Sequence, residues 1–369
     1  MKQGIFICNT VLQVLIAAWM KYDMLKDEVT DIIISNHMNG NEIIAENLKK
    51  TGLFNSVITV ASLDYSRGKC IHRNRFIRLL HRRFPYLDLK GFADIKNRYD
   101  NLYIANFDLF SQLIYDFLAR KNKKLNLMLF EDGTSSYSMM VKKYYDSTMP
   151  PDNKKTRFIY ETLLNKKFIY GNIKAFWLFR PDLMEWKPNF PTLPIKKIDS
   201  ANKEFRTIIN AAFGYDTLND QYAEKYIFFE EAFFAESGYM EDVELVEELA
   251  EIVGKENIFI KIHPRNPKNR FKELGYATNA NTFIPWEIIA MNLDITGKKL
   301  ISIMSSSIMN PVSILGLKCK SYSVIECLKS KPDILNGDFG KCIVRLFENY
   351  NEIHICKDIK EVLKDYNES

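Results

Sequence analysis

The feature that most constrains the fold is an alternation of short apolar runs with amphipathic segments, which occurs in both halves of the chain. Apolar runs of strand length stand at 4–8, 31–35, 56–60, 101–105, 125–130, 226–230, 258–262, 299–303 and 319–323. Apolar residues at helical spacing fill most of the intervals, for example at 11–25, 108–121 and 241–253. This alternation is typical of parallel sheets flanked by helices, so the sequence predicts an α/β fold.

The length of 369 residues fits two such domains better than one. The rhythm becomes less clear between 142 and 199, where the segment contains several prolines, and it resumes at 226. We interpret the end of this segment as an interdomain connection. The predicted organisation is therefore two Rossmann-like, doubly wound domains that cover residues 1–195 and 196–369.

Composition excludes several classes of protein. The formal net charge of +5 is too small to indicate a nucleic-acid partner. The six cysteines are scattered without a Cys-x-x-Cys pair, which predicts reduced thiols in a cytoplasmic protein and neither a disulfide framework nor a zinc site. The apolar segment at 5–20 is interrupted by polar residues and no cleavage site follows it, so it predicts strand, loop and helix instead of a signal peptide.

The segment 66–84 is strongly basic, and apolar residues are interleaved with its arginines, lysines and histidines. Such a pattern predicts a basic amphipathic helix, and residues 71–84 would suit a peripheral contact with an anionic membrane. A solvated basic face on a packed helix explains the pattern equally well.

A candidate catalytic carboxylate follows the apolar run 125–130. Glu131, Asp132 and Gly133 come directly after this run, where a parallel strand would open into a ligand crevice. An ordinary turn explains the same residues, because Asp and Gly favour turns. Glu131 could also raise the pKa of Asp132 through like charge and so make Asp132 a better base.

Three groups of polar residues lie at strand ends or at a helix start in the second half of the chain. His263 and Pro264 follow the run 258–262, where an imidazole can hold or protonate a leaving phosphate. Glu287 falls in the first turn of a predicted helix, where a carboxylate can bind ribose hydroxyls or simply suit the helix dipole. The serines at 305–307 open a further helix, and their hydroxyls and backbone N–H groups could bind phosphate.

Several common motifs are absent from the sequence. It contains no Asp-x-Asp, His-Glu-x-x-His, Gly-x-x-x-x-Gly-Lys or Gly-x-Gly-x-x-Gly. Metal-assisted nucleotide-sugar chemistry, zinc hydrolysis and P-loop phosphoryl transfer therefore lack their usual residues. A nucleotide-phosphate site without metal or other cofactor fits best.

The order of Glu131-Asp132-Gly133, His263-Pro264 and Ser305-Ser306-Ser307 resembles that in the bacterial sialyltransferases, and most closely in glycosyltransferase family 52. The opening Ile7-Cys8-Asn9-Thr10-Val11-Leu12-Gln13 is also similar to the first strand and loop of that family. The resemblance implies a GT-B fold, in which two Rossmann-like domains face each other across a cleft. It further implies a CMP-sialic acid donor, no metal, and inversion of the anomeric centre in one displacement.

The resemblance also implies roles for individual residues. Asp132 would be the general base that deprotonates the acceptor hydroxyl, and His263 would bind or protonate the departing CMP phosphate. Closure of the two domains would bring these groups together around the substrates. The remaining residues that we expect at the donor are Asn9, Thr10, Gly133, Pro264, Glu287, Ser305, Ser306 and Ser307.

The sequence therefore predicts transfer of sialic acid from CMP-Neu5Ac to a galactose-type hydroxyl of a bacterial surface glycan, such as lipooligosaccharide or capsule. The sequence does not distinguish an α2,3, an α2,6 or a polymerising α2,8 linkage. It also leaves open whether the protein forms a homodimer. Two alternatives also remain, namely another donor (CMP-Kdo or a UDP-hexose) and a non-catalytic glycan-binding protein. The expected location is the cytoplasm, with peripheral contact at the inner face of the membrane left open.

Overall fold

The computed structural model describes residues 1–63, 90–96, 98–216 and 222–365. The chain divides into two compact units. The first unit contains residues 1–195 together with 207–214, and the second contains residues 196–206 together with the chain from 215 onward. Each unit is built on its own parallel sheet.

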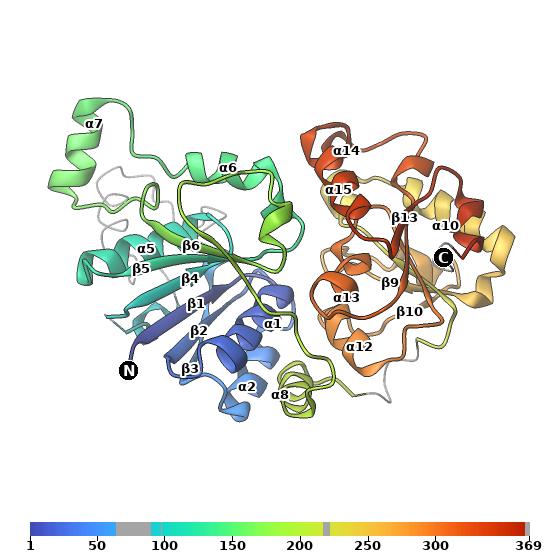
Figure 1. Ribbon diagram of the computed structural model, residues 1–369, viewed down its shortest axis with the longest axis horizontal. Coiled ribbons are helices and arrows are strands. Elements are labelled where there is room, and N and C mark those ends of the chain that lie inside the picture. The colour runs from blue at the N-terminus through green and yellow to red at the C-terminus, as the bar shows by residue number, and fades with distance from the viewer. Residues whose placement is uncertain (64–89, 97, 217–221, 366–369) are drawn as a thin grey trace. The chain divides into compact units, whose positions relative to one another are not determined.

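The sheet of the first unit has seven strands in the order β3-β2-β1-β4-β5-β6-β7, and every neighbouring pair is parallel. Helices cover both of its faces (Figure 1). Its central strands are buried along almost their whole length, which explains why they read as continuous apolar runs. The strands are β1 (Gln3–Cys8), β2 (Val29–Ser35), β3 (Ser56–Val60), β4 (Asn101–Ile104), β5 (Asn126–Phe130), β6 (Ile173–Leu178) and β7 (Thr192–Pro194).

The sheet of the second unit has six parallel strands in the order β10-β9-β8-β11-β12-β13. In both sheets the strand order reverses beside the first strand of the unit, which places a topological switch point between β1 and β4 and another between β8 and β11. The strands are β8 (Tyr226–Phe229), β9 (Ile258–Lys261), β10 (Ala277–Thr278), β11 (Lys299–Ser302), β12 (Lys320–Ser323) and β13 (Ile353–Ile355).

Thirteen α-helices lie within the described residues. Those between the strands of the first sheet are α1 (Val11–Trp19), α2 (Asn41–Thr51), α5 (Leu109–Lys121), α6 (Met139–Asp146) and α7 (Lys154–Phe158). Helix α8 (Lys203–Phe213) follows β7. The others are α9 (Phe233–Ser237), α10 (Glu241–Val253), α11 (Arg270–Glu273), α12 (Trp286–Asn292), α13 (Asn310–Ser313), α14 (Asp333–Asn336) and α15 (Asp338–Glu348).

The predicted strands of both halves are confirmed to within one or two residues at each end, but the expectations were wrong in three places. Residues 142–199 contain two strands, β6 and β7, which extend the first sheet. The single helix expected at 11–25 is α1 followed by a π-helical segment, Met20–Met24. The helix expected from Ser306 is a three-residue 3-10 turn, Ser306–Ile308, followed by the four-residue α13.

Other expectations concern the membrane and the cysteines. The basic segment 66–84 lies outside the described residues. None of the helices in the described ranges combines the length and the apolar character that crossing a bilayer requires. Five of the six cysteines lie within the described residues, and all five are free thiols, of which Cys8, Cys319, Cys342 and Cys356 are buried.

Candidate active site

The first unit gathers polar side chains where β1, β4 and β5 end. These strands are neighbours in the sheet, so the residues that follow them meet at one edge. Asn9 follows β1, Asn106 and Asp108 follow β4, and Asp132 follows β5. The sequence alone identified Asn9 and Asp132 as site residues but not Asn106 or Asp108.

Gln13 connects the end of β1 to the candidate base. Its amide Nε2 donates to Asp132 Oδ1 over 2.5 Å, and its Oε1 accepts the backbone N–H of Asn9 over 2.6 Å. Thr10 caps α1 by accepting the N–H of Gln13 over 3.3 Å, which fixes the first turn from which Gln13 reaches inward. Gln13 is fully buried, although it is polar. In the sequence, the signal that could have identified Gln13 is a glutamine within an otherwise apolar helix.

Asp108 and Asn106 complete the polar cluster. Asn9 Nδ2 donates to Asp108 Oδ2 over 2.9 Å and lies 3.4 Å from Asn106 Oδ1. Asp108 also caps α5 by accepting the N–H of Ser111 over 2.6 Å. The cluster therefore brings two carboxylates, Asp108 and Asp132, to the same edge of the sheet.

Burial raises the pKa of Asp132 above the ordinary aspartate value, and the nearby charge of Asp108 raises this pKa further. Hydrogen bonds from the side chains of Gln13 and Asn106 lower the pKa and so partly oppose these effects. Since the side chain of Asp132 is partly exposed, a bound hydroxyl can reach it. A carboxylate in this environment is more basic than a free aspartate, as a general base requires.

Glu131 has a different position and a different role from Asp132. Its Oε2 accepts the hydroxyl of Tyr137 over 2.5 Å and the N–H of Phe179 over 2.8 Å, and the side chain is fully buried. Burial raises the pKa of Glu131 to about 7. Burial is the largest cause of the raised pKa of Asp132, while the charges of Glu131 and Asp132 also interact, so the expected influence of Glu131 on this pKa stays a prediction. Glu131 instead ties the loop after β5 to the loop after β6.

Gly133, Ser135 and Ser136 belong to a tight loop that directly follows Asp132. Gly133 has φ 65°, a left-handed conformation that strongly favours glycine. The N–H of Asp132 donates to Ser136 Oγ over 2.7 Å, and Ser135 Oγ donates to the carbonyl of Asp132 over 3.0 Å. These bonds fix the backbone on both sides of the candidate base.

In the second unit, His263 follows β9, which is a neighbour of β8 in the sheet. Its backbone N–H donates to Glu230 Oε2 over 3.0 Å, and its Nδ1 accepts the N–H of Arg265 over 3.1 Å. Because Nδ1 accepts a hydrogen bond, the neutral ring carries its proton on Nε2. Burial lowers the pKa of His263 to about 3, and the positive charges of Arg265 and Lys261 contribute. The neutral ring can therefore donate through Nε2, and a bound anion would raise this pKa.

Buried ionic contacts hold the loop of His263 in place. Arg270 in α11 pairs with Asp242 in α10 over 2.6 Å and with Glu230, directly after β8, over 2.7 Å. All three side chains are nearly inaccessible to solvent. Glu230 thus accepts hydrogen bonds from both Arg270 and the backbone of His263. Neither Glu230 nor Arg270 was identified from the sequence.

The structure corrects the expected role of the backbone N–H groups around the serines. Glu231 Oε1 accepts the N–H of Met304 over 3.0 Å and the hydroxyl of Ser302 over 2.7 Å. The N–H of Ser305 bonds to Ser302 Oγ, and the N–H of Ser307 bonds to Ser305 Oγ. These three N–H groups are therefore not free to bind phosphate. The side chains of Ser305, Ser306 and Ser307 are each partly exposed at the end of β11.

Glu287 occupies the first turn of α12, as predicted, but it is almost completely buried. Its Oε1 accepts Asn310 Nδ2 over 2.5 Å, which connects α12 to α13, the helix after the serines. Burial raises the pKa of Glu287, while Lys261 at the end of β9 lowers it. Pro264 is partly exposed next to His263. His263 and the serines follow β9 and β11, the two neighbours of β8, and therefore lie at the same edge of the second sheet.

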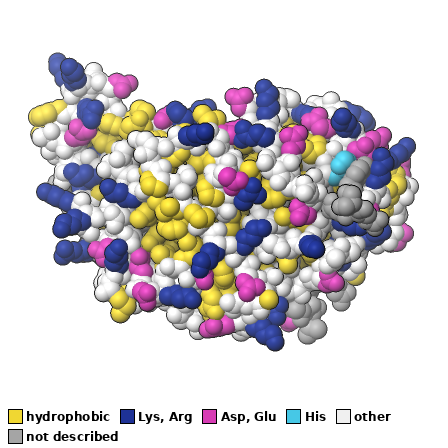
Figure 2. Space-filling model, in the orientation of Figure 1, with side chains coloured by type: hydrophobic (Ala, Val, Ile, Leu, Met, Phe, Trp, Pro, Cys, Tyr) yellow, Lys and Arg dark blue, Asp and Glu magenta, His cyan; other side chains and the backbone are white. Residues whose placement is uncertain are grey.

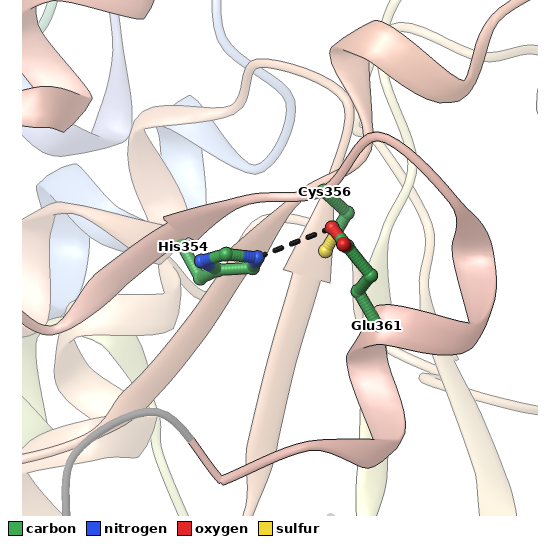
Figure 3. Close-up of side chains that lie close together, drawn as sticks. All are labelled: His354, Cys356 and Glu361. Atoms are coloured by element: carbon green, nitrogen blue, oxygen red, sulfur yellow. Dashed lines mark hydrogen bonds and ion pairs between the residues drawn. The ribbon is translucent and has the colours of Figure 1, made fainter.

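One group of metal-ligating side chains lies elsewhere within the described residues. His354, Cys356 and Glu361 place ligand atoms within 4.8 Å of one another at the end of β13, and His354 Nε2 lies 3.3 Å from Glu361 Oε2 (Figure 3). Burial and nearby acids raise the pKa of Cys356 to about 12, which opposes formation of a thiolate. Lys364 Nζ also lies 3.9 Å from Glu361 Oε1. We therefore assign no metal to this group.

Comparison with solved structures supports the fold. The α/β-galactoside α-2,3-sialyltransferase of Photobacterium phosphoreum aligns with a TM-score of 0.53 and 15% identity, over 96% of this chain and 98% of that one. TcCGT1 in complex with UDP aligns with a TM-score of 0.51 and 9% identity, over 98% of this chain and 88% of that one. The architecture is a GT-B fold of two Rossmann-like units. No curated protein sequence matches the chain.

Comparison with protein families identifies the class of enzyme. The model of the alpha-2,8-polysialyltransferase family matches residues 4–323, which is most of the chain. The predicted resemblance to bacterial sialyltransferases is thereby confirmed, whereas the finer assignment to family 52 stays a prediction. A non-catalytic glycan-binding protein is no longer a competing interpretation. The chain belongs to the alpha-2,8-polysialyltransferase family and is a sialyltransferase.

Proposed function

We propose that the protein transfers sialic acid from CMP-Neu5Ac to a glycan hydroxyl with inversion and without a metal, using Asp132 as general base. The observation that carries this proposal is the position of Asp132 at the end of β5, where it accepts a hydrogen bond from the buried Gln13 and has a raised pKa. A direct displacement on an activated sugar needs a base of this kind to accept the proton of the attacking hydroxyl.

In the proposed step, the acceptor oxygen forms a bond to the anomeric carbon of sialic acid while its proton moves to the Asp132 carboxylate. The bond between the anomeric carbon and the phosphate oxygen breaks, and CMP leaves with the electron pair. Because positive charge develops on the sugar and negative charge on the phosphate, groups that stabilise the phosphate accelerate the reaction. No further co-reactant is needed.

His263 is the proposed partner of the leaving phosphate. The hydrogen bond from Arg265 to Nδ1 leaves the proton on Nε2, and the positive charges of Lys261 and Arg265 favour an anion nearby. As the phosphate gains negative charge, the pKa of His263 rises and its hydrogen bond to the phosphate becomes stronger. We expect His263 to act mainly as a hydrogen-bond donor, because its pKa without ligand is about 3.

The serines and Glu287 complete the proposed donor site. With three backbone N–H groups of the loop already bonded, we assign phosphate binding to the hydroxyls of Ser305, Ser306 and Ser307. Glu287 stays the proposed ribose contact. It is also held by Asn310, so its replacement should disturb the position of α13 in addition to nucleotide binding.

The family description favours one of the linkages that the sequence left open. It names α2,8-polysialyl transfer, so we propose an acceptor that already ends in sialic acid. The solved relative from Photobacterium phosphoreum is named for α-2,3 transfer to galactosides, and a galactose-terminated acceptor stays the second candidate. The two acceptors end in different sugars, of which only sialic acid carries a carboxylate, so a short oligosialoside and lactose distinguish them directly.

The test is incubation of the purified protein with CMP-Neu5Ac in EDTA, with either an oligosialoside or lactose, and measurement of released CMP and of sialylated product. Asp132→Asn should reduce transfer by about two to four powers of ten and leave CMP binding nearly unchanged. Transfer that survives this substitution within a few-fold would remove Asp132 from the role of base. Loss of wild-type activity in EDTA that added metal restores would contradict metal independence.

The alternative donors are tested by nucleotide binding. CMP should raise the melting temperature of the protein, because a ligand that binds only the native state stabilises it. UDP should not raise this temperature. Stabilisation by UDP alone would favour a UDP-hexose donor. If CMP binds but CMP-Neu5Ac is not consumed, CMP-Kdo becomes the donor to examine.

A further inference from the structure

A projecting segment of the first unit exposes apolar side chains that a soluble helix ordinarily buries. Helix α7 and the π-helical turn that continues it, Ile159–Leu163, contain no buried residue. Phe158 is 58% exposed, Ile159 is 44% exposed and Leu163 is 65% exposed. Figure 1 shows α7 standing away from the sheet of its unit, and Figure 2 shows hydrophobic and basic side chains together in that region. We call residues 154–168 the projecting segment.

The projecting segment has two different faces. Arg157 and Glu161, four residues apart, form an ion pair of 2.9 Å and lie on one side of the helix. Helical spacing places Ile159 and Leu163 on the opposite side and Phe158 at the boundary between the two sides. The apolar residues therefore form the outer face of an amphipathic helix, and its inner face is charged.

The inner face lines a cavity of about 510 Å³. Tyr115 and Ala119 of α5 and the nearby Lys123 form one wall, and Arg157, Lys166 and Lys167 of the projecting segment contribute to the rest. The basic residues make this space favourable for anions. The apolar outer face and the basic cavity are thus two sides of the same short segment.

The charge of the projecting segment is strongly unbalanced. It contains five basic residues, Lys154, Lys155, Arg157, Lys166 and Lys167, against the single acidic residue Glu161, which pairs with Arg157. Apolar side chains on one face with lysine and arginine around them are the pattern of helices that lie in the interface of an anionic bilayer. A second copy of this chain would bring the same positive charge to the same patch, so charge disfavours self-association through it.

We propose that residues 154–168 dock the protein on an anionic membrane surface. Phe158, Ile159 and Leu163 enter the boundary between headgroups and acyl chains, and the exposed Lys154 and Lys155 contact the lipid phosphates. Burial of a large apolar side chain strengthens binding by about tenfold or more, and each basic residue near an anionic surface contributes about fivefold. The projecting segment contains neither Asp132 nor His263, and the proposed docking does not depend on the roles proposed for them.

The test is sedimentation of the full chain with vesicles of phosphatidylcholine alone or mixed with phosphatidylglycerol. The variant Phe158→Ser/Leu163→Ser should bind the anionic vesicles at least about tenfold more weakly than wild type. The matched control Ile43→Ser/Ile334→Ser removes two exposed apolar residues from α2 and α14, and it should bind as wild type. Since all four side chains are exposed, both variants should fold, as their melting temperatures will verify.

Each other outcome overturns the proposal. Absence of wild-type binding to anionic vesicles at low salt would exclude a membrane site. Binding that the Phe158→Ser/Leu163→Ser variant retains would move the contact elsewhere, for example to residues 71–84. A change in oligomeric state caused by this variant, without any vesicle binding by wild type, would make the patch an interface between copies. Transfer to a soluble acceptor should be unchanged in the variant, which separates this test from that of Asp132.

Discussion

Two adjacent acids, Glu131 and Asp132, should respond to neutralisation in opposite ways, because one is a buried structural group and the other is the proposed base. Burial raises the pKa of Glu131 from 4.5 to about 7. The native protein therefore holds this proton more tightly than the unfolded chain does. The contribution of Glu131 to stability is therefore fully present below pH 4.5 and is lost as the pH rises to about 7.

The size of this effect follows from the shift itself. A pKa of about 7 in place of 4.5 corresponds to a cost of about 3 kcal/mol for ionised Glu131 in the native state above pH 7. Glu131→Gln removes the charge but keeps an oxygen that can accept the Tyr137 hydroxyl and the Phe179 N–H. We expect the variant to be similar to wild type at pH 5 and more stable by up to about 3 kcal/mol at pH 8.

The assay is urea unfolding of both proteins at several values between pH 5 and 8. Glu251→Gln on α10 is the control, because its side chain is exposed and its neutralisation should have little effect at any pH. A stability difference between Glu131→Gln and wild type that is the same at pH 5 and pH 8 would refute the reasoning. Glu131→Gln should also keep transfer activity within a few-fold of wild type, in contrast to Asp132→Asn.

Three further predictions follow from the contacts of the two sites. Gln13→Ala removes a hydrogen bond that lowers the pKa of Asp132, so the acidic limb of the pH–rate profile should move to higher pH; an unmoved limb would contradict this. His263→Ala should weaken CMP binding and slow turnover together, as titration calorimetry and steady-state kinetics can measure, and unchanged values would return His263 to a turn-forming role. Arg270→Met leaves the charges of Glu230 and Asp242 buried without their partner, so the free energy of unfolding should decrease by about 3 to 5 kcal/mol. A melting temperature equal to that of wild type would contradict this prediction.

The sequence by itself determined the architecture, because hydrophobic periodicity is a local property. Strands buried on both faces read as apolar runs, and the helices between them show a period of 3.6 residues. The same pattern placed Asp132, His263 and Ser305 at the ends of strands, where a parallel sheet opens toward ligands. The strands between 142 and 199 were not predicted; β7, for example, is only three residues long and ends in a proline.

Only the tertiary structure decided which polar groups act on one another. Gln13 lies 119 residues from Asp132 in the chain, and no local pattern links them, but the order of β1, β4 and β5 in the sheet makes them partners. Likewise, the hydroxyls of Ser302 and Ser305 accept the N–H groups of Ser305 and Ser307 that were expected to bind phosphate, and Glu131 accepts hydrogen bonds from Tyr137 and Phe179. Residue type and spacing determine where chemistry can occur, whereas burial and hydrogen bonding, which depend on the whole fold, decide the protonation and availability of each group.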